Sequence, residues 1–220
     1  MERKLTSNQL KLLAMLTMTL DHIGVQLFPG VLWLRIIGRL AFPIYAYMIA
    51  EGCAHTRNRR KYLLQMAGLA LLCQLVYFFA MGSLFQCILV TFTLSSLLIY
   101  ACDTGSRPLT VLALLGVAFV TVALPRLLPG TDFAIDYGFF GVLVPVAVYL
   151  GKTHREKLLF MAFTLAALAW SVGDIQWYSL AALLPLALYG GQRGKRRMKW
   201  LFYLYYPLHL AAIYGISLLL

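Results

Sequence analysis

Ionisable residues interrupt several long apolar runs of this chain. Asp21 and His22 lie in the first run, Arg35 and Arg39 in the second, and His209 in the last. An Arg or Asp at the centre of a bilayer costs at least about 2.5 kcal/mol on insertion scales. Each of these side chains is therefore expected to face the interior of a helical bundle and to have a partner there. Residues that are so costly in hydrocarbon usually serve a function.

The Asp-His pair and the two arginines are expected to lie at a similar depth. Asp21 is about 13 residues into its helix, roughly 20 Å from the cytoplasmic end at 1.5 Å per residue. Arg35 and Arg39 begin the returning helix and, being four residues apart, share one helical face. Such a cluster could hold His22 in one tautomer as a general base and use an arginine to stabilise an oxyanion.

A purely structural role for the same residues stays open. A salt bridge from Asp21 to Arg35 or Arg39 could simply pin the first helix to the second, with His22 as a satisfied polar residue. His209 could likewise make a single hydrogen bond across the bundle, or it could be a rival base to His22.

A second polar group lies where the second apolar run ends. Glu51 and His55 are expected near the inner membrane surface, where a solvated interface is the simpler interpretation. A basic loop follows immediately, with a second one at residues 193–199. The positive charge of both loops favours a position on the cytoplasmic side, in contact with anionic lipid. Alternatively, the loops could form a binding site for a phosphate-rich ligand. The cations of the first loop are Arg57, Arg59, Arg60 and Lys61.

Composition determines the class of protein that must position these residues. Of the 220 residues, 61% are hydrophobic and 12% are charged, against about 45–50% and about 25% in an ordinary soluble domain. Together with a mean hydropathy of +0.79, this excludes a soluble globule, a disordered chain and a coiled coil. We therefore predict an all-α, polytopic integral membrane bundle.

The charge and the cysteines point to no other class. The formal net charge is +11, but the cations lie between apolar runs, so they are topology determinants and no nucleic-acid partner is expected. The four cysteines show no CxxC or Cys/His spacing, so we predict neither a metal site nor a disulfide framework.

Apolar runs that end at glycine, proline or charge predict about nine transmembrane helices. The first is expected to be a retained helix and not a signal peptide. No internal repeat or long linker divides the chain, so residues 1–220 are expected to form one transmembrane domain. The predicted runs cover residues 8–28, 31–54, 62–81, 84–102, 109–128, 137–151, 158–173, 175–190 and 200–219.

The distribution of Lys and Arg predicts the orientation of these runs. With the N-terminus inside, the inner side collects 16 of the 19 Lys and Arg residues, and the outer side has only Arg126. Because basic loops stay in the cytoplasm, this bias favours a cytoplasmic N-terminus and an external C-terminus.

Several sequence blocks resemble the TraX family, which is named for the conjugation-system protein that acetylates the N-terminus of F-type pilin. The order and spacing of the blocks cover nearly the whole chain. They are Asp21-His22-Ile23-Gly24, Arg35 to Pro43, Glu51-Gly52, His55 to Tyr62, Asp136-Tyr137-Gly138 with Gly141 to Pro145, and Tyr205-Tyr206-Pro207-Leu208-His209-Leu210.

The resemblance implies an acetyltransferase in the bacterial cytoplasmic (inner) membrane, with acetyl-CoA as co-substrate and no metal. His22, oriented by Asp21, would deprotonate the acceptor or carry the acetyl group, and Arg35 or Arg39 would stabilise the oxyanion. His209 would be the rival base. The remaining polar residues would hold the CoA phosphates (His55, Arg57, Arg59, Arg60 and Lys61) or serve a substrate or structural role (Glu51 and Asp136).

Other functions remain open at this point. Clusters of Asp, His and Arg also build proton relays, so a proton-coupled transporter is one alternative, and a scaffold for a pilin-like peptide is another. The acceptor could be a peptide, a sugar or a lipid, and membrane lipids are the other expected partners.

Overall fold

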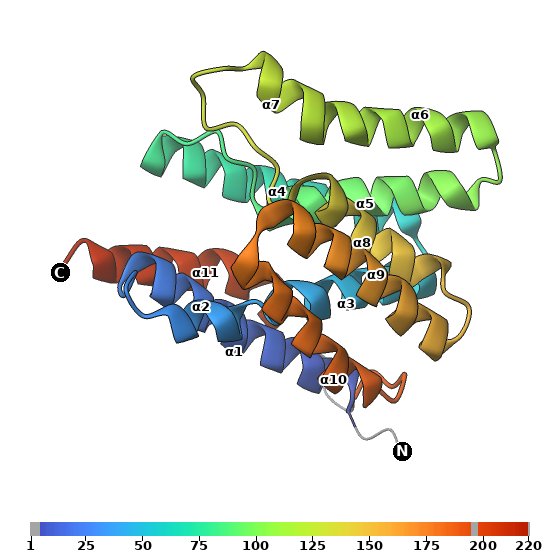
Figure 1. Cartoon of the computed structure of the whole chain (residues 1–220), viewed down its shortest axis with the longest axis horizontal. Helices are drawn as coiled ribbons and strands as arrows, with labels where there is room; N and C mark the ends of the chain where they lie inside the picture. The colour runs from blue at the N-terminus through green and yellow to red at the C-terminus, as the bar shows by residue number, and fades with distance from the viewer. Residues whose placement is uncertain (1–4, 195–197, 220) are drawn as a thin grey trace. The chain divides into compact units, whose positions relative to one another are not determined.

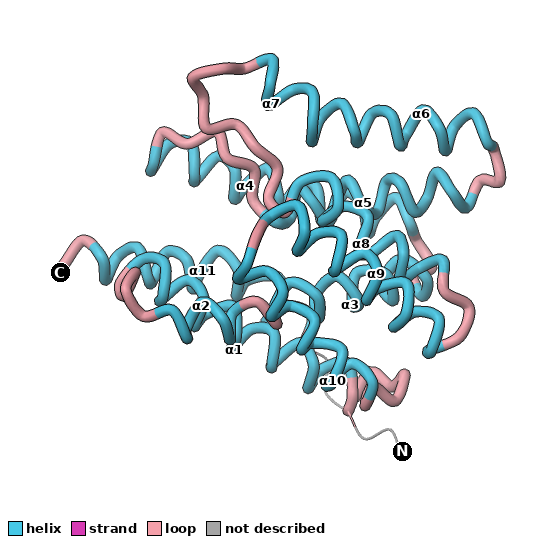
Figure 2. The backbone as a smooth tube through the Cα atoms, in the orientation of Figure 1, coloured by secondary structure: helices cyan, strands magenta, loops and turns pink. Residues whose placement is uncertain are grey.

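The computed structural model describes residues 5–194 and 198–219, and this part of the chain is helical (Figures 1 and 2). Within it there is no strand, only two isolated bridges, Leu5 to Tyr189 and Gln86 to Ile135. The prediction of an all-α fold is therefore confirmed.

The helices follow one another with short connections. The α-helices of the first half are α1 (Ser7–Gln26), α2 (Leu32–Gly38), α3 (Ala41–His55), α4 (Arg59–Met81) and α5 (Ile88–Asp103). Those of the second half are α6 (Arg107–Ala118), α7 (Leu124–Leu127), α8 (Gly138–Leu150), α9 (His154–Val172), α10 (Leu183–Ala187) and α11 (Lys199–Ser217). A π-helical turn, η1 (Phe119–Ala123), joins α6 to α7, and a 3₁₀ helix, η2 (Asp174–Ala182), precedes α10.

Each predicted apolar run corresponds to a helical stretch, and three of the runs are subdivided. The run 31–54 contains α2 and α3, the run 109–128 contains α6, η1 and α7, and the run 175–190 contains η2 and α10. By length and composition, three described stretches could cross a membrane, namely Leu32–His55, Arg59–Phe79 and Arg107–Leu127. Long apolar helices of this kind characterise a membrane protein.

Local sequence explains where several helices begin and end. The Thr6 side chain accepts a hydrogen bond from the Gln9 N–H, and the Gln9 side chain accepts one from the Thr6 N–H, so a capping box starts α1. Asn58 caps α4 by accepting from the Lys61 N–H at 2.8 Å. The break between α2 and α3 has a proline as its cause, because Pro43 cannot donate to the carbonyl of Arg39, four residues earlier.

The described chain divides into two compact units. Unit 1 comprises Met1–Met48 and Leu165–Leu220, and unit 2 comprises Ile49–Thr164. In unit 1, α1 packs against α2 and α11, and η2 packs against α2. In unit 2, α5 packs against α4, α6 and α8. The prediction of a single transmembrane domain is not tested by this division and stays a prediction.

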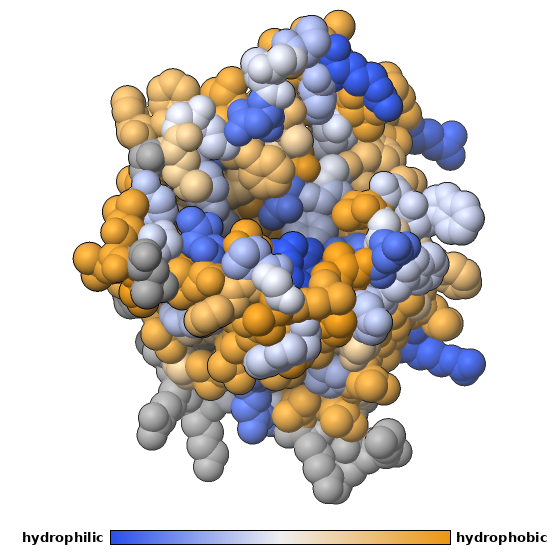
Figure 3. All heavy atoms as spheres, turned by 60° about the vertical axis from the view of Figure 1, so that its left-hand side comes forward, coloured by the Kyte–Doolittle hydropathy of each residue, from blue (hydrophilic) through white to orange (hydrophobic). Residues whose placement is uncertain are grey.

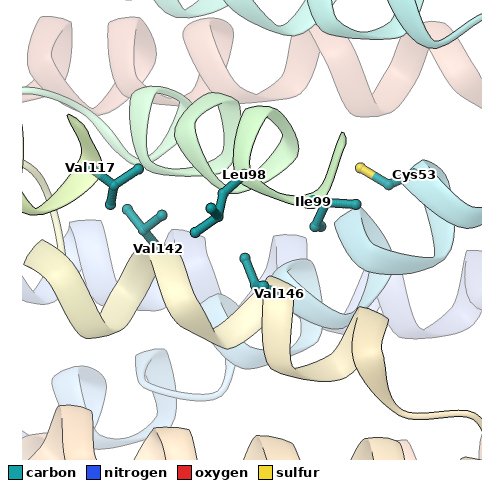
Figure 4. Packing of buried hydrophobic residues seen from close by; sticks show 6 residues of the cluster. All are labelled: Cys53, Leu98, Ile99, Val117, Val142 and Val146. Atoms are coloured by element: carbon teal, nitrogen blue, oxygen red, sulfur yellow. The ribbon is translucent and has the colours of Figure 1, made fainter. Parts of the chain in front are cut away.

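The core of unit 2 shows how apolar helices of this chain pack. Leu98 and Ile99 of α5 face Val142 and Val146 of α8, and Val117 of α6 lies against them (Figure 4). All of these side chains are almost fully buried. Branched aliphatic residues at a spacing of four along α8 give a continuous apolar face, which is what a helix needs to pack against a neighbour.

Many other large apolar side chains are exposed. Phe79, Phe163, Trp170, Leu184 and Leu219 are each more than two-thirds exposed. The space-filling view shows hydrophobic side chains over much of the visible face, with hydrophilic ones gathered in patches (Figure 3). In water such a surface would be an aggregation liability, so hydrocarbon is the solvent that suits it.

A polar link in unit 2 joins the loop after α4 to the loop before α8. The Ser83 hydroxyl and the Leu84 N–H donate to the two oxygens of Asp132, at 2.5 and 2.9 Å. These hydrogen bonds, chiefly the one from Ser83, hold the pKa of Asp132 below its usual value, because they favour the charged carboxylate. The two loops are therefore tied together when Asp132 is ionised.

Candidate functional site

Glycines let α2 approach α1 closely in unit 1. A Cβ atom on Gly38 would lie 2.3 Å from the Cβ of Asp21, and one on Gly24 would lie 2.8 Å from the Cβ of Leu34. Real side-chain carbons do not approach so closely, so only glycine fits at these two positions. The close contact brings the start of the second apolar run against Asp21.

The carboxylate of Asp21 is held by both arginines of the second run. Arg39 Nη2 lies 2.6 Å from Asp21 Oδ1 and 2.5 Å from Oδ2, and Arg35 Nη1 lies 3.4 Å from Oδ1. The ion pairs that the sequence offered as a structural alternative are therefore present. They draw Asp21 toward the arginines, so its contacts are with them and not with the ring of His22.

Arg39 makes more hydrogen bonds than Arg35 and is less exposed. Its Nε donates to the Arg35 carbonyl at 3.4 Å, and its Nη1 donates to Gln176 Oε1 at 3.4 Å. Only 9% of the Arg39 side chain is exposed, against 29% of the Arg35 side chain. Arg35 therefore keeps more of its donors available for another group.

The two histidines meet each other across α1 and α11. His22 Nδ1 lies 2.8 Å from His209 Nε2, and His209 Nδ1 lies 2.8 Å from the carbonyl oxygen of Tyr205. A carbonyl can only accept, so His209 carries its proton on Nδ1, and with a neutral ring its Nε2 is an acceptor. His22 must then donate from Nδ1, and when the His22 ring is also neutral this leaves a lone pair on its Nε2.

Aromatic contacts fix the orientation of this histidine pair. The ring of Tyr205 stacks on the ring of His209 with centroids 5.0 Å apart, and Tyr206 meets His209 edge-on at 5.7 Å. The Tyr205 hydroxyl is hydrogen-bonded to the Thr19 hydroxyl. Because Thr19 donates its own proton to the Met15 carbonyl at 2.9 Å, Tyr205 is the donor in that bond.

The polar residues at the end of α3 lie in unit 2 and are paired there. Glu51 Oε1 lies 2.5 Å from Lys157 Nζ, and only 14% of the Glu51 side chain is exposed. His55 Nδ1 lies 2.9 Å from the Glu51 carbonyl oxygen, with its ring largely exposed. Glu51 is thus ion-paired with Lys157, a contact that was not predicted from the sequence.

The first basic loop contains one ion-paired arginine and three further exposed cations. Arg59 forms an ion pair with Asp103, which also accepts a hydrogen bond from the Tyr149 hydroxyl at 2.7 Å, and its guanidinium lies 5.3 Å from the centre of the Tyr100 ring. The side chains of Arg57, Arg60 and Lys61 are exposed at the start of α4. These three cations remain accessible to a ligand.

Of two further predicted regions, the one around Asp136 is described in full and the second basic loop in part. Asp136 lies before α8 in unit 2, where its carbonyl accepts from the Thr91 hydroxyl at 2.7 Å. In the second basic loop, Arg193 lines a pocket with Asn8 and Gln9 beside the start of α1. Lys195, Arg196 and Arg197 lie outside the described residues.

The sequence did not predict a role for Gln176 or for the Tyr205 carbonyl. Gln176 is an uncharged residue, so it did not stand out among the ionisable ones, although an amide inside the run 175–190 was a usable signal. A backbone carbonyl carries no sequence signal of its own. Among the described residues, no group of three or more His, Cys, Asp or Glu side chains is arranged to hold a metal ion.

Comparisons with known proteins cover most of the chain. The family described as "TraX protein" matches residues 6–217. The probable fimbrial assembly protein FimC of Dichelobacter nodosus is 28% identical over 93% of this chain and 93% of its own length. Protein TraX of Escherichia coli is 28% identical over 72% of this chain and 62% of its own length.

No solved structure matches this chain. The family match nevertheless spans α1 to α11, and it includes both histidines and both arginines of the unit 1 cluster. The chain therefore belongs to the TraX family.

Proposed function

We propose that this protein is a membrane-embedded acetyltransferase that moves an acetyl group from cytoplasmic acetyl-CoA to an acceptor amine or hydroxyl. The observation that carries the proposal is the hydrogen-bonded series from the Tyr205 carbonyl through His209 to His22, which leaves His22 Nε2 unprotonated. Membership of a family implicated in pilin acetylation supports the same reaction.

In the proposed reaction His22 is the general base. Its Nε2 takes the proton of the acceptor while the acceptor nitrogen or oxygen bonds to the thioester carbonyl carbon. The carbon–sulfur bond then breaks, and His22 returns the proton to the departing thiolate. His209 is a positioning residue here, because it holds the proton of His22 on Nδ1, and this replaces the expectation that Asp21 orients His22.

Arg35 is the better candidate for stabilising negative charge on the reacting oxygen. Arg39 already donates to Asp21 and Gln176, whereas Arg35 directs one nitrogen at Asp21 and is partly exposed. A guanidinium with remaining donors can interact with a developing oxyanion. Asp21 then keeps the two arginines in place beside His22.

The CoA phosphates are proposed to bind at the first basic loop of unit 2. Arg57, Arg60 and Lys61 are exposed, and cations of this kind suit phosphate oxygens. Arg59 would contribute less because Asp103 holds its guanidinium. His55 lies in the same segment, and Glu51 has a structural role through Lys157.

The membrane arrangement and the acceptor complete the proposal. About nine spans, a cytoplasmic N-terminus and a location in the bacterial inner membrane would place the basic loop where acetyl-CoA is available. A relative named as a probable fimbrial assembly protein favours a pilin-like peptide as acceptor.

Calorimetric binding of acetyl-CoA to the detergent-purified protein tests the proposal. Wild-type protein is expected to bind with a dissociation constant near 1 μM, about −8 kcal/mol. A variant with Arg57, Arg60 and Lys61 all changed to Gln should bind at least about tenfold more weakly, because it lacks the phosphate contacts.

The matched control changes three other exposed cations, Arg107, Lys152 and Arg155, to Gln. Both variants lose the same net charge, so equal weakening would mean only a general electrostatic effect. Absence of binding by folded wild-type protein would sink the proposal and favour a transporter or a scaffold.

A further inference from the structure

The helix η2 presents a polar stripe to the interior of unit 1. It is a 3₁₀ helix over nine residues, and its buried residues are Gln176, Ser179 and Ala182. In a 3₁₀ helix residues three apart eclipse each other, so these three side chains lie in one line along one face. On the other side Trp177 and Tyr178 are about half exposed. The 3₁₀ geometry thus aligns an amide and a hydroxyl in the interior.

Both polar side chains in this stripe have hydrogen-bond donors without a partner in the part of the chain that the structure describes. Gln176 and Ser179 are 0% exposed, and Gln176 Nε2 and Ser179 Oγ make no hydrogen bond to any described residue. Buried donors are almost always satisfied in native proteins. Two unsatisfied donors on one face of one helix therefore need an explanation.

The orientation of the Gln176 amide is not arbitrary. Arg39 Nη1 donates to Gln176 Oε1 at 3.4 Å, and a guanidinium cannot accept a hydrogen bond, so the oxygen faces Arg39 and the NH₂ group faces away from it. Arg39 in turn is bonded to Asp21, the neighbour of His22. Through these contacts η2 is joined to the cluster that contains the proposed base.

We propose that Gln176 Nε2 and Ser179 Oγ bind the carbonyl oxygen of the acyl group that is transferred. This inference rests on the proposed acetyltransferase function and names two residues that contact the reacting group. An NH₂ group and a hydroxyl both donate to an oxygen, and preorganised donors in a water-excluded site stabilise an oxyanion strongly.

The two donors would act while the carbonyl oxygen is negatively charged. The acceptor atom bonds to the carbonyl carbon, its proton moves to His22 Nε2, and the electron pair of the carbon–oxygen π bond moves to the oxygen. Gln176 and Ser179 donate to that oxygen, with the proposed Arg35 guanidinium beside them, until the π bond re-forms and the carbon–sulfur bond breaks. The proton on His22 then goes to the thiolate, so every atom and charge is accounted for.

Ser179→Ala separates this role from a structural one. Ser95 is a matched control, because it is also 0% exposed but donates to the carbonyls of Thr91 and Val142 at 2.9 and 2.8 Å. Ser95→Ala should lower the unfolding temperature, since it removes a satisfied buried hydrogen bond. Ser179→Ala should leave the unfolding temperature unchanged or raise it, because it removes an unsatisfied group.

Acetyl transfer should respond to the Ser179 change independently of stability. Ser179→Ala is expected to lower kcat roughly 100-fold with little change in the KM for acetyl-CoA, as for loss of one oxyanion donor. Gln176→Leu should have an effect of similar size and serves as a second variant. Retention of wild-type turnover in both variants would overturn the inference while leaving the acetyltransferase proposal standing.

Infrared spectroscopy of bound acetyl-CoA labelled with ¹³C at the carbonyl reads the contact directly. In wild-type protein the carbonyl band should move to lower frequency than in free acetyl-CoA, and part of that shift should be lost in Ser179→Ala. An unchanged band combined with a raised KM for the acceptor would assign the donors to an acceptor carbonyl and overturn this assignment. No acetyl-CoA binding by the wild-type protein would overturn the inference together with the proposed function.

Discussion

His22 gains its proposed chemistry from a residue 187 positions further along the chain. The Tyr205 carbonyl fixes the proton of His209 on Nδ1, and His209 in turn fixes the proton of His22 on Nδ1. The lone pair on His22 Nε2 is therefore a consequence of how α11 lies against α1. A base that a second group holds in one tautomer is the usual arrangement for activating a nucleophile.

Substitution of His22 is expected to lower acetyl transfer more than substitution of His209. His22→Ala should lower kcat/KM for acetyl transfer by about 10³-fold or more, because the base is lost. His209→Ala should lower it by about 10²-fold, because the His22 tautomer is no longer fixed. His209→Gln should recover part of the activity, since its amide oxygen can accept from His22 Nδ1. Release of free CoA in the presence of a peptide with a free N-terminal amine measures all three.

Acetyl-CoA affinity is the internal control for this series, and it should stay within about twofold of wild type in each variant. Abolished transfer in His209→Ala together with retained transfer in His22→Ala would make His209 the base. Equal activity of His209→Ala and His209→Gln would show that His209 does not act by fixing the tautomer of His22.

The close packing of α2 on α1 requires glycine at Gly38 as well as at Gly24. Gly38 sits against Asp21, and the same approach brings Arg35 and Arg39 within reach of that carboxylate. The break before Pro43 ends α2 at Arg39, which contacts Gln176 of η2. Glycine, arginine and proline thus act together at the start of the second apolar run.

Gly38→Ala should therefore separate the two helices. The added methyl group overpacks the contact, with an expected loss of about 1–3 kcal/mol in the free energy of unfolding. Acetyl transfer should fall as well, because Asp21 no longer aligns the arginines. Thermal unfolding in detergent and the transfer assay provide the measurements.

Gly116→Ala is the matched control for this change. A Cβ atom on Gly116 of α6 would meet nothing within 4 Å, and alanine is the better helix former by up to about 1 kcal/mol. Its unfolding temperature should be unchanged or higher. A Gly38→Ala protein as stable and active as Gly116→Ala would show that close approach of α2 to α1 is not required.

At the scale of the whole molecule, the predicted orientation requires the short helix α8 to cross the membrane. The 13 residues of α8 extend about 20 Å, which is shorter than the roughly 30 Å of a hydrocarbon core. The proposed orientation nevertheless places the loop before α8 outside and the basic loop after it inside. If α8 did not cross, all loops after it would change sides.

Cysteine labelling on either side of α8 decides this point. In a Cys102→Ser background, where the other three native thiols are buried, Thr131→Cys should react with a membrane-impermeant maleimide in cells with a permeabilised outer membrane. Lys152→Cys should react only after the inner membrane is disrupted, because positively charged loops stay in the cytoplasm. Labelling of both positions while the inner membrane is intact would contradict the nine-span arrangement.

The sequence by itself determined the helical class, the positions of the helical stretches and the membrane character. Each of these follows from local properties, namely apolar run length, glycine and proline punctuation and the cost of charge in hydrocarbon. It also indicated that Asp21 would meet Arg35 or Arg39, because opposite charges at similar depth on consecutive helices have few other partners.

Only the tertiary structure decided which polar groups of distant segments meet. In the structure His22 is hydrogen-bonded to His209, and Gln176 of η2 accepts a hydrogen bond from Arg39. The ion pairs of unit 2 join Arg59 to Asp103 and Glu51 to Lys157. These contacts depend on how each helix is rotated about its axis and on which neighbour it packs against. The rotation of each helix and the identity of its neighbours depend on the packing of all side chains together. A local sequence pattern therefore does not predict them.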